Sequence, residues 1–202
     1  PILEDILAHN KTPIICGGTG QYIDALIFDT AIPKVPPNKK LRKELEEKST
    51  EELFKLLTKK DPIRASSIDP HNKVRIIRAL EIIESIGSVP LQKLPTYKYP
   101  TTIYVMSPSR ELLRTKITAR LEKRLKNGMI EEVEDVMKKG HSSTTMKKFG
   151  LEYVTIGKHL EGTLTESAMK EELITKIMQY AKRQQTWNKK YLKDAIIVEV
   201  KE

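Results

Sequence analysis

The stretch PIICGGTGQY, residues 13–22, joins an apolar run to three glycines around one threonine, and sequence of helical character follows it. A strand, a glycine turn and a helix in this order often bring backbone amides close to a phosphate or a base. Gly17, Gly18 and Gly20 permit positive φ angles and leave room for a ligand. Thr19 is then expected to project its hydroxyl from the end of the strand. The alternative is a tight turn in which Thr19 only caps the helix.

The composition is that of a globular chain with excess positive charge. Of 202 residues, 39% are hydrophobic and 31% are charged, which allows one substantial core. The net charge of +9 favours a polyanionic partner. No run approaches the roughly 18 apolar residues of a membrane helix, and no signal peptide opens the sequence. We therefore expect a cytoplasmic protein that does not bind membranes.

The only cysteine is Cys16, which excludes disulfides within the chain and thiolate zinc clusters. Its place in an apolar run predicts a buried thiol. The first residues, PILEDILAHNKT, have helical spacing without a preceding cap, so we expect them to be the last turns of a longer helix. We interpret the chain as a fragment.

Three short β-branched runs, at 13–16, 101–106 and 195–200, predict buried strands. Most of the remaining sequence has helical periodicity. Helices are expected over 19–28, 39–48, 50–58, 72–86 and 109–127, then in a second helix that continues to residue 139, and over 152–160 and 166–192. Strands separated by long helical excursions predict an α/β fold with a parallel sheet covered by helices.

Two proline-rich hinges, TAIPKVPPNKK and GSVPLQKLPTYKYP, divide the chain. We expect a first part of the core over residues 1–33, a helical lobe over 34–100, and the second part of the core over 101–202.

Two cationic helices are candidate RNA contacts. In SIDPHNKVRIIRALEIIESIG, Arg75 and Arg78 lie one turn apart with Glu81 a turn further on, and the alternative is a helix with one internal ion pair. The segment SRELLRTKITARLEKRLKNG contains seven basic residues and only two acidic ones. The basic ladder, Arg110, Arg114, Lys116, Arg120 and Arg124, suits a line of phosphates, although a charged helix face is often only solvated.

The string QYAKRQQTWNKKY is the most distinctive of the motifs. Lys182 and Arg183 next to Gln184 suit a pyrophosphate together with the polar edge of a base. Trp187 can be a packing anchor or a base stacker.

Taken together, GGTGQY, IDPHNKVRIIRALE, SRELLRTKITARLEKRLKNGMIEEV and YAKRQQTW resemble, in order, motifs of the tRNA dimethylallyltransferases, also called tRNA isopentenyltransferases. The resemblance covers most of the chain from residue 13 to about residue 187. It implies a P-loop-kinase-like parallel sheet, here incomplete, with a helical insertion lobe that grips the anticodon stem-loop.

The resemblance also implies the reaction. The family transfers a dimethylallyl group from dimethylallyl diphosphate to the exocyclic amine of a flipped adenine, 3′-adjacent to the anticodon, and requires Mg²⁺. Thr19 would lie beside the reacting amine and the leaving oxygen of the diphosphate, and Lys182 and Arg183 on the pyrophosphate side. Arg75, Arg78, the basic ladder and Gln184 would bind tRNA.

This sequence departs from the family pattern in several places. The family's phosphate loop and its aspartate-serine motif do not occur in these residues, so we assign neither a general base nor a metal ligand. Met178 stands where an arginine is common, Asn72 stands where an aspartate is common, and no function is assigned to Tyr153. We expect a monomer that binds RNA at best weakly and transfers nothing by itself.

Two other functions are compatible with the residues. The chain could be a non-catalytic RNA-binding protein derived from this family. It could also be a related transferase acting on free adenine nucleotides, but a mononucleotide does not need a cationic track as long as the ladder from Arg110 to Arg124.

Overall fold

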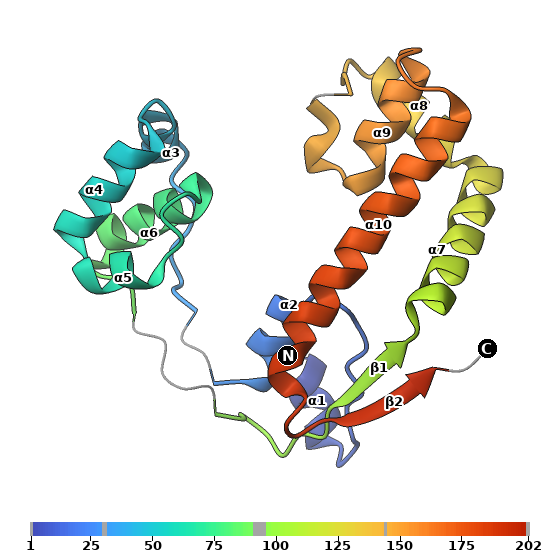
Figure 1. Ribbon diagram of the computed structural model, residues 1–202. Coiled ribbons are helices and arrows are strands. Elements are labelled where there is room, and N and C mark those ends of the chain that lie inside the picture. Colours follow the sequence, from blue (N-terminus) through green and yellow to red (C-terminus); the bar gives the residue numbers. More distant parts are fainter. Residues whose placement is uncertain (1, 30–31, 91–95, 144, 201–202) are drawn as a thin grey trace. The chain divides into compact units, whose positions relative to one another are not determined.

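The computed structural model describes residues 2–29, 32–90, 96–143 and 145–200, and residues 30–31 and 91–95 of the two expected hinges lie outside this part. Its elements are α1 (Ile2–Ala8), α2 (Gly20–Ile27), α3 (Lys39–Glu46), α4 (Thr50–Lys60), α5 (Pro62–Ser67), α6 (Lys73–Ile86), β1 (Tyr104–Pro108), α7 (Arg110–Arg124), the π-helical turn η1 (Leu125–Met129), α8 (Ile130–Lys138), the 3-10 turn η2 (Thr145–Lys148), α9 (Leu151–Leu160), α10 (Glu166–Asn188), the 3-10 turn η3 (Lys189–Tyr191) and β2 (Ile196–Val200) (Figure 1).

The contacts divide the chain into two compact units, each described here by itself. The first unit contains residues 1–20 and 102–202, and the second contains residues 21–101. The lobe expected over 34–100 lies inside the second unit. No helix in the described part of the chain has both the length and the apolarity that crossing a membrane requires.

Most helices begin where a side chain can satisfy their free amides. Ser49 and Glu52 form a reciprocal capping box at the start of α4. Asn72 accepts a hydrogen bond from the backbone amide of Arg75 at the start of α6, and Ser109 caps α7 in the same way. The short α5 was not predicted from the sequence, and it starts with Pro62 behind the capping carboxylate of Asp61.

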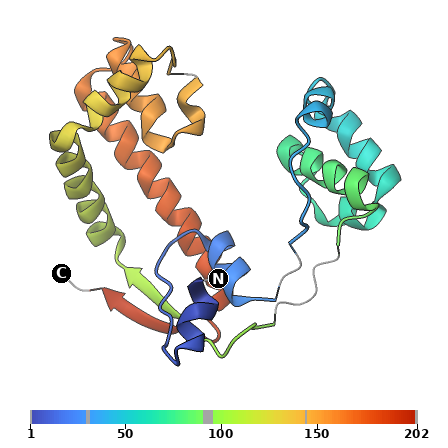
Figure 2. The same cartoon turned by 180° about the vertical axis from the view of Figure 1, so that it is seen from behind.

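In the second unit, helices α3 to α6 enclose an apolar core, and Figure 2 shows them from behind. Its most deeply buried members, Leu53, Leu57 and Ile76, are fully inaccessible to solvent. The apolar residues of α6 do not all face this core: Ile77, Leu80 and Ile83 do, whereas Val74 is 78% exposed and Ile86 is 52% exposed. The lobe therefore has a hydrophobic core of its own.

A buried carboxylate, Glu81 on α6, is the most constrained polar group of this lobe. Only 1% of Glu81 is exposed, and it accepts hydrogen bonds from Nε of Arg42 at 2.9 Å and from the backbone amide of Asn38 at 2.6 Å. Arg78 also pairs with Glu81 and donates to the carbonyl oxygen of Val35 at 2.9 Å. These bonds, those from Arg42 first, lower the pKa of Glu81 to about 2. One carboxylate thus connects α6, α3 and the segment before α3.

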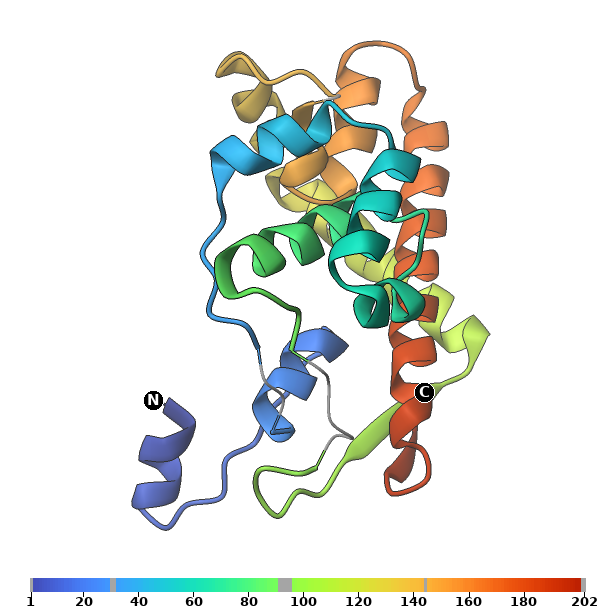
Figure 3. The same cartoon turned by 90° about the vertical axis from the view of Figure 1, so that its left-hand side faces the viewer.

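The first unit combines a parallel two-stranded sheet with helices α7 to α10. β1 and β2 pair in register from Tyr104 opposite Ile196 to Pro108 opposite Val200. The core lies between the helices and includes Leu121, Ile156 and Leu173. The chain bends within η1, between α7 and α8, at Gly128, whose φ is 89°. The long α10 is continuous in every view, including the side view (Figure 3).

The parallel pairing confirms the predicted sheet, but two expectations about the strands are wrong. Residues 13–16 form no strand, because β1 and β2 pair only with each other in the described part of the chain. Ile14 is 90% exposed, and Cys16 is exposed where a buried thiol was expected. The sheet itself is not buried either, since Val105 is the only residue of β1 and β2 that is buried. An apolar run predicts extended backbone, but burial also needs a neighbouring layer.

We predict that Glu81→Gln destabilises the lobe by about 3 kcal/mol, because it leaves two guanidinium groups without their buried counter-charge. Glu84, which lies on α6 like Glu81 and forms an exposed ion pair with Lys60 of α4 at 3.1 Å, provides the control. Glu84→Gln should cost at most about 0.5 kcal/mol. Urea unfolding of both variants measures the difference, and equal losses would contradict the prediction.

The same carboxylate predicts how stability depends on pH. Its pKa is about 2 in the folded chain and 4.5 ordinarily, so folding favours the ionised form. The stabilisation is therefore fully present above about pH 4.5 and is lost as the pH falls toward 2. Acid titration should show that Glu81→Gln removes part of this pH dependence and that Glu84→Gln does not.

Candidate functional site

The glycine turn ends on the first residue of α2. Gly17, Gly18 and Thr19 are exposed, whereas Gly20 is buried. None of the three glycines has a positive φ, so the turn does not use the left-handed backbone that glycine permits. Gly18 and Gly20 are needed for another reason, which is the close approach of α10.

Two side chains of α10 lie directly against this turn. A Cβ atom built on Gly18 would be 2.8 Å from Cδ of Gln184, and one built on Gly20 would overlap the indole ring of Trp187. A Cβ on Gly17 would meet nothing within 4 Å. The structure thus brings together the two most distinctive strings of the sequence, which are more than 160 residues apart.

The polar groups at this junction are available to a ligand. Thr19 is exposed and Gln184 is half-buried, and neither side chain has a hydrogen-bond partner among the described residues. A hydroxyl can donate or accept, and a carboxamide can do both at once, which suits the edge of a base. These two groups form the candidate site of the first unit.

The two cations next to Gln184 differ in where they point. Lys182 and Arg183 are both exposed, and the guanidinium of Arg183 lies 5.5 Å from the centroid of the Tyr180 ring. Successive residues of a helix are rotated by about 100°, so Arg183 lies about 100° and Lys182 about 160° around α10 from Gln184. Of the two, Arg183 is the nearer to the glycine-turn side.

The cations of the basic ladder on α7 are all exposed, but they are not equivalent. Arg114 pairs with Glu171 of α10 at 2.9 Å, and Arg124 pairs with Glu152 of α9 at 3.1 Å. Lys116 and Arg120 have no ion pair among the described residues, nor does Arg110. The stripe beneath the ladder is formed mainly by Leu112, Ile117 and Leu121. Leu113 and Leu125 on the same helical segment are only partly buried.

The other two predicted tRNA contacts belong to the second unit. Arg75 is exposed at the start of α6 and has no ion pair among the described residues. Arg78 is occupied by Glu81, which matches the alternative of an internal ion pair. The sequence did not reveal Arg42 as the second partner of Glu81, because the two residues are 39 positions apart.

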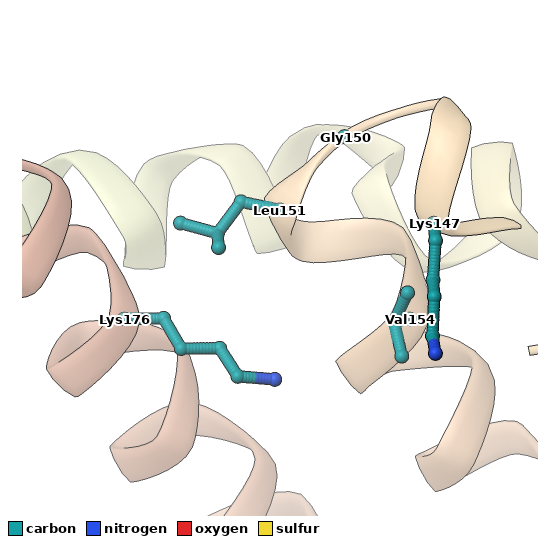
Figure 4. A pocket seen from close by; sticks show the side chains of 5 residues that line it. All are labelled: Lys147, Gly150, Leu151, Val154 and Lys176. Carbon is teal, nitrogen blue, oxygen red and sulfur yellow. The ribbon is translucent and has the colours of Figure 1, made fainter. Parts of the chain in front are cut away.

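A shallow hollow of about 470 Å³ lies where α9, η2 and α10 meet (Figure 4). Lys147 and Lys176 line it together with Leu151 and Val154. The ammonium of Lys176 already donates to Glu172 at 2.5 Å and to the hydroxyl of Thr155 at 2.8 Å. That bond to Lys176 is the main cause of the lowered pKa of Glu172. We assign no ligand to this hollow.

Carboxylate oxygens are the side-chain ligands that Mg²⁺ prefers in proteins. Nowhere in the described ranges do three or more His, Cys, Asp or Glu side chains gather closely enough to hold a metal ion. No step below is assigned to a metal ion.

Two solved structures with a similar fold are named as transferases that act on tRNA. The chain aligns with the full-length tRNA isopentenylpyrophosphate transferase of Bacillus halodurans at a TM-score of 0.59 and 27% identity, over 98% of this chain and 63% of that one. A eukaryotic dimethylallyltransferase, captured acting on tRNA, aligns at a TM-score of 0.76 and 22% identity, over 98% and 54% of the two chains. The second likeness shows the fold alone. The architecture is thus that of the tRNA isopentenyltransferases.

Sequence comparison gives the family. Residues 1–191 match the family model described as IPP transferase. The chain is 35% identical to the tRNA dimethylallyltransferase of Caldicellulosiruptor saccharolyticus, over 98% of this chain and 66% of that protein. It is 38% identical to tRNA dimethylallyltransferase 2 of Porphyromonas gingivalis, over 90% and 60%. The chain belongs to the IPP transferase family, which confirms the resemblance inferred from its motifs, and it spans about two thirds or less of these relatives.

The exposure of the ladder predicts that its cations can be neutralised without unfolding the chain. Arg120→Gln and Arg124→Gln should each change the free energy of unfolding by less than about 0.5 kcal/mol, because exposed ion pairs contribute little. Thermal unfolding measures this. Ile117→Ala on the same helix, at a side chain only 4% exposed, is the positive control and should cost about 2–5 kcal/mol.

Proposed function

We propose that this chain contributes the tRNA-binding and diphosphate-binding parts of a tRNA dimethylallyltransferase. The reaction transfers a dimethylallyl group from dimethylallyl diphosphate to the exocyclic amine of the adenine 3′-adjacent to the anticodon. The observation that carries this proposal is the junction between the glycine turn and α10, where Thr19 and Gln184 present unpaired polar groups. The family membership and the names of the relatives support it.

The chemistry defines what these groups would do. The adenine amine attacks the allylic carbon, a carbon–nitrogen bond forms, the carbon–oxygen bond to the diphosphate breaks, and pyrophosphate leaves. Donors near the leaving oxygen stabilise its developing charge. Thr19 would donate there, and Arg183 with Lys182 would neutralise the pyrophosphate. The amine proton goes to a general base, for which no residue of this chain is assigned.

RNA binding would rest on the basic ladder, with Arg75 and Arg78 as further contacts. A flipped adenine costs a few kcal/mol of lost stacking, which phosphate contacts can offset. The unpaired cations Lys116 and Arg120 need break no ion pair to reach a phosphate. We rank them above Arg114 and Arg124, which would first have to leave Glu171 and Glu152.

Three further points belong to the proposal. The transfer is expected to require Mg²⁺, to which we assign no ligand here. A cytoplasmic location follows from a tRNA substrate, and a monomer is sufficient because one chain carries both the glycine turn and the ladder. Size-exclusion chromatography with light scattering measures the oligomeric state.

The decisive experiment measures binding of this chain to an anticodon stem-loop with adenine at the target position, across a salt series. The control hairpin carries a pyrimidine there. We expect affinity to fall steeply with salt and to be lower for the control. Binding that is salt-dependent but indifferent to the base would support a non-catalytic RNA-binding protein instead, and absence of binding would contradict the RNA partner.

We predict that Arg120→Gln reduces the slope of log affinity against log salt by about 0.9 and weakens both hairpins equally, because a phosphate contact carries no sequence information. Lys138→Gln, on α8 outside the ladder, is the matched control and should leave the slope unchanged. A similar change in slope for both variants would argue against the ladder as the phosphate-binding face.

Inorganic pyrophosphate tests the other substrate. Arg183→Gln should weaken its binding about tenfold, since a charge-assisted hydrogen bond contributes about 1.5–3 kcal/mol. Lys182→Gln should weaken it less, because Lys182 lies further around α10 from the glycine turn. Quenching of the single tryptophan, Trp187, or calorimetry measures the affinity. Equal affinities of Arg183→Gln and the unmodified chain would exclude Arg183 from the diphosphate site.

A further inference from the structure

We propose that Trp187 is a positioning residue that fixes the glycine turn, and with it Thr19, against the C-terminal part of α10. The catalytic consequence rests on the proposed function, whereas the packing itself does not. The sequence left Trp187 open as either a packing anchor or a base stacker. The structure provides a specific surface for the indole to anchor.

The surface is the backbone of Gly20. The indole lies so close that a Cβ atom on Gly20 would overlap its Cδ1, Nε1 and Cγ atoms. Gly20 is buried, whereas Thr19 immediately before it is exposed. Any residue larger than glycine at this position would push the ring away, because an indole is rigid and has only two rotatable bonds with which to yield.

The other side of the contact is also defined. The ammonium of Lys190 lies 4.3 Å from the centroid of the Trp187 ring, within the range of a cation–π interaction. One turn earlier on α10, Gln184 contacts Gly18 in the same manner. Gln184 and Trp187 are three residues apart and so lie on one face of the helix. They contact the residues that flank Thr19 on both sides.

This arrangement couples the indole to Thr19. Adjacent Cα atoms are joined rigidly at about 3.8 Å, so a displacement of Gly20 moves Thr19 with it. Gln184 has a flexible side chain that can give way, whereas the indole cannot, which makes Trp187 the determinant of the pair. A misplacement of about 1 Å can cost a hundredfold in rate when a group must lie within about 3–3.5 Å of the reacting atoms.

The packing can be tested with the chain's own fluorescence, because Trp187 is its only tryptophan. Gly20→Ala should shift the emission to longer wavelength, increase quenching by acrylamide, and move the amide resonance of Thr19. Gly17→Ala is the matched control, because a Cβ there meets nothing within 4 Å and the backbone has no positive φ. It should leave the emission unchanged. Identical emission from Gly20→Ala and the unmodified chain would overturn the proposal.

A second measurement separates positioning from a merely structural role. With the two hairpins described above, Gly20→Ala should bring the ratio of the adenine and pyrimidine dissociation constants toward one, with the salt slope unchanged. Trp187→Phe should retain most of the preference and Trp187→Leu should lose it. In the Trp187→Leu background, Gly20→Ala should cost nothing more, because the two changes remove the same contact. A loss that is equal for both hairpins would make the contact purely structural and refute a positioning role.

The two hypotheses can fail independently. If the unmodified chain has no adenine preference, the proposed function fails at the base-binding step. The emission of Gly20→Ala and the Thr19 resonance in the two Trp187 variants then decide the positioning proposal. A Thr19 resonance that does not move in Trp187→Leu would overturn it.

Discussion

The candidate site consists of the glycine turn and the C-terminal part of α10, and the packing of the Trp187 indole on the backbone of Gly20 connects them. Trp187 is near the end of a 23-residue helix, and Gly20 is the first residue of another. Because Gly20 has no side chain, backbone and ring meet directly, and the threonine between two such contacts is left exposed. The same requirement explains the glycines at positions 18 and 20, although neither has a positive φ. Close approach, and not an unusual backbone angle, is the constraint.

Charge is organised differently in the two units. In the second unit, Glu81 is buried and draws Arg42 and Arg78 inward, so that these cations stabilise the lobe. In the first unit, the ion pairs of the basic ladder connect α7 to neighbouring helices; the pair of Arg114 is exposed, and that of Arg124 is formed with the half-buried Glu152. Such exposed pairs exchange readily with water and with anions, because little desolvation holds them together. The cations of this chain with its net charge of +9 are thus of two kinds. Arg42 and Arg78 pair with a buried carboxylate, whereas those of the basic ladder are exposed on α7.

Local patterns in the sequence predicted the helices well, since a cap followed by a buried stripe is encoded in a few neighbouring residues. They also predicted a parallel sheet, which β1 and β2 form, and they contain the four motifs that indicate the family. They failed at residues 13–16, where an apolar run was interpreted as a buried strand and Cys16 as a buried thiol. A strand depends on a hydrogen-bonded neighbour, which may lie anywhere along a chain, so no local pattern can guarantee it.

The sequence by itself determined the family, the helical elements and the list of candidate residues. Each of these depends on residues that are close together in the sequence. Only the tertiary structure decided which of those residues meet. It joined the glycine turn to Gln184 and Trp187, paired Arg42 with Glu81, and left Lys116 and Arg120 without ion pairs in the described part of the chain. Contacts over such separations depend on how whole helices pack, and packing is a property of the fold and not of any one segment.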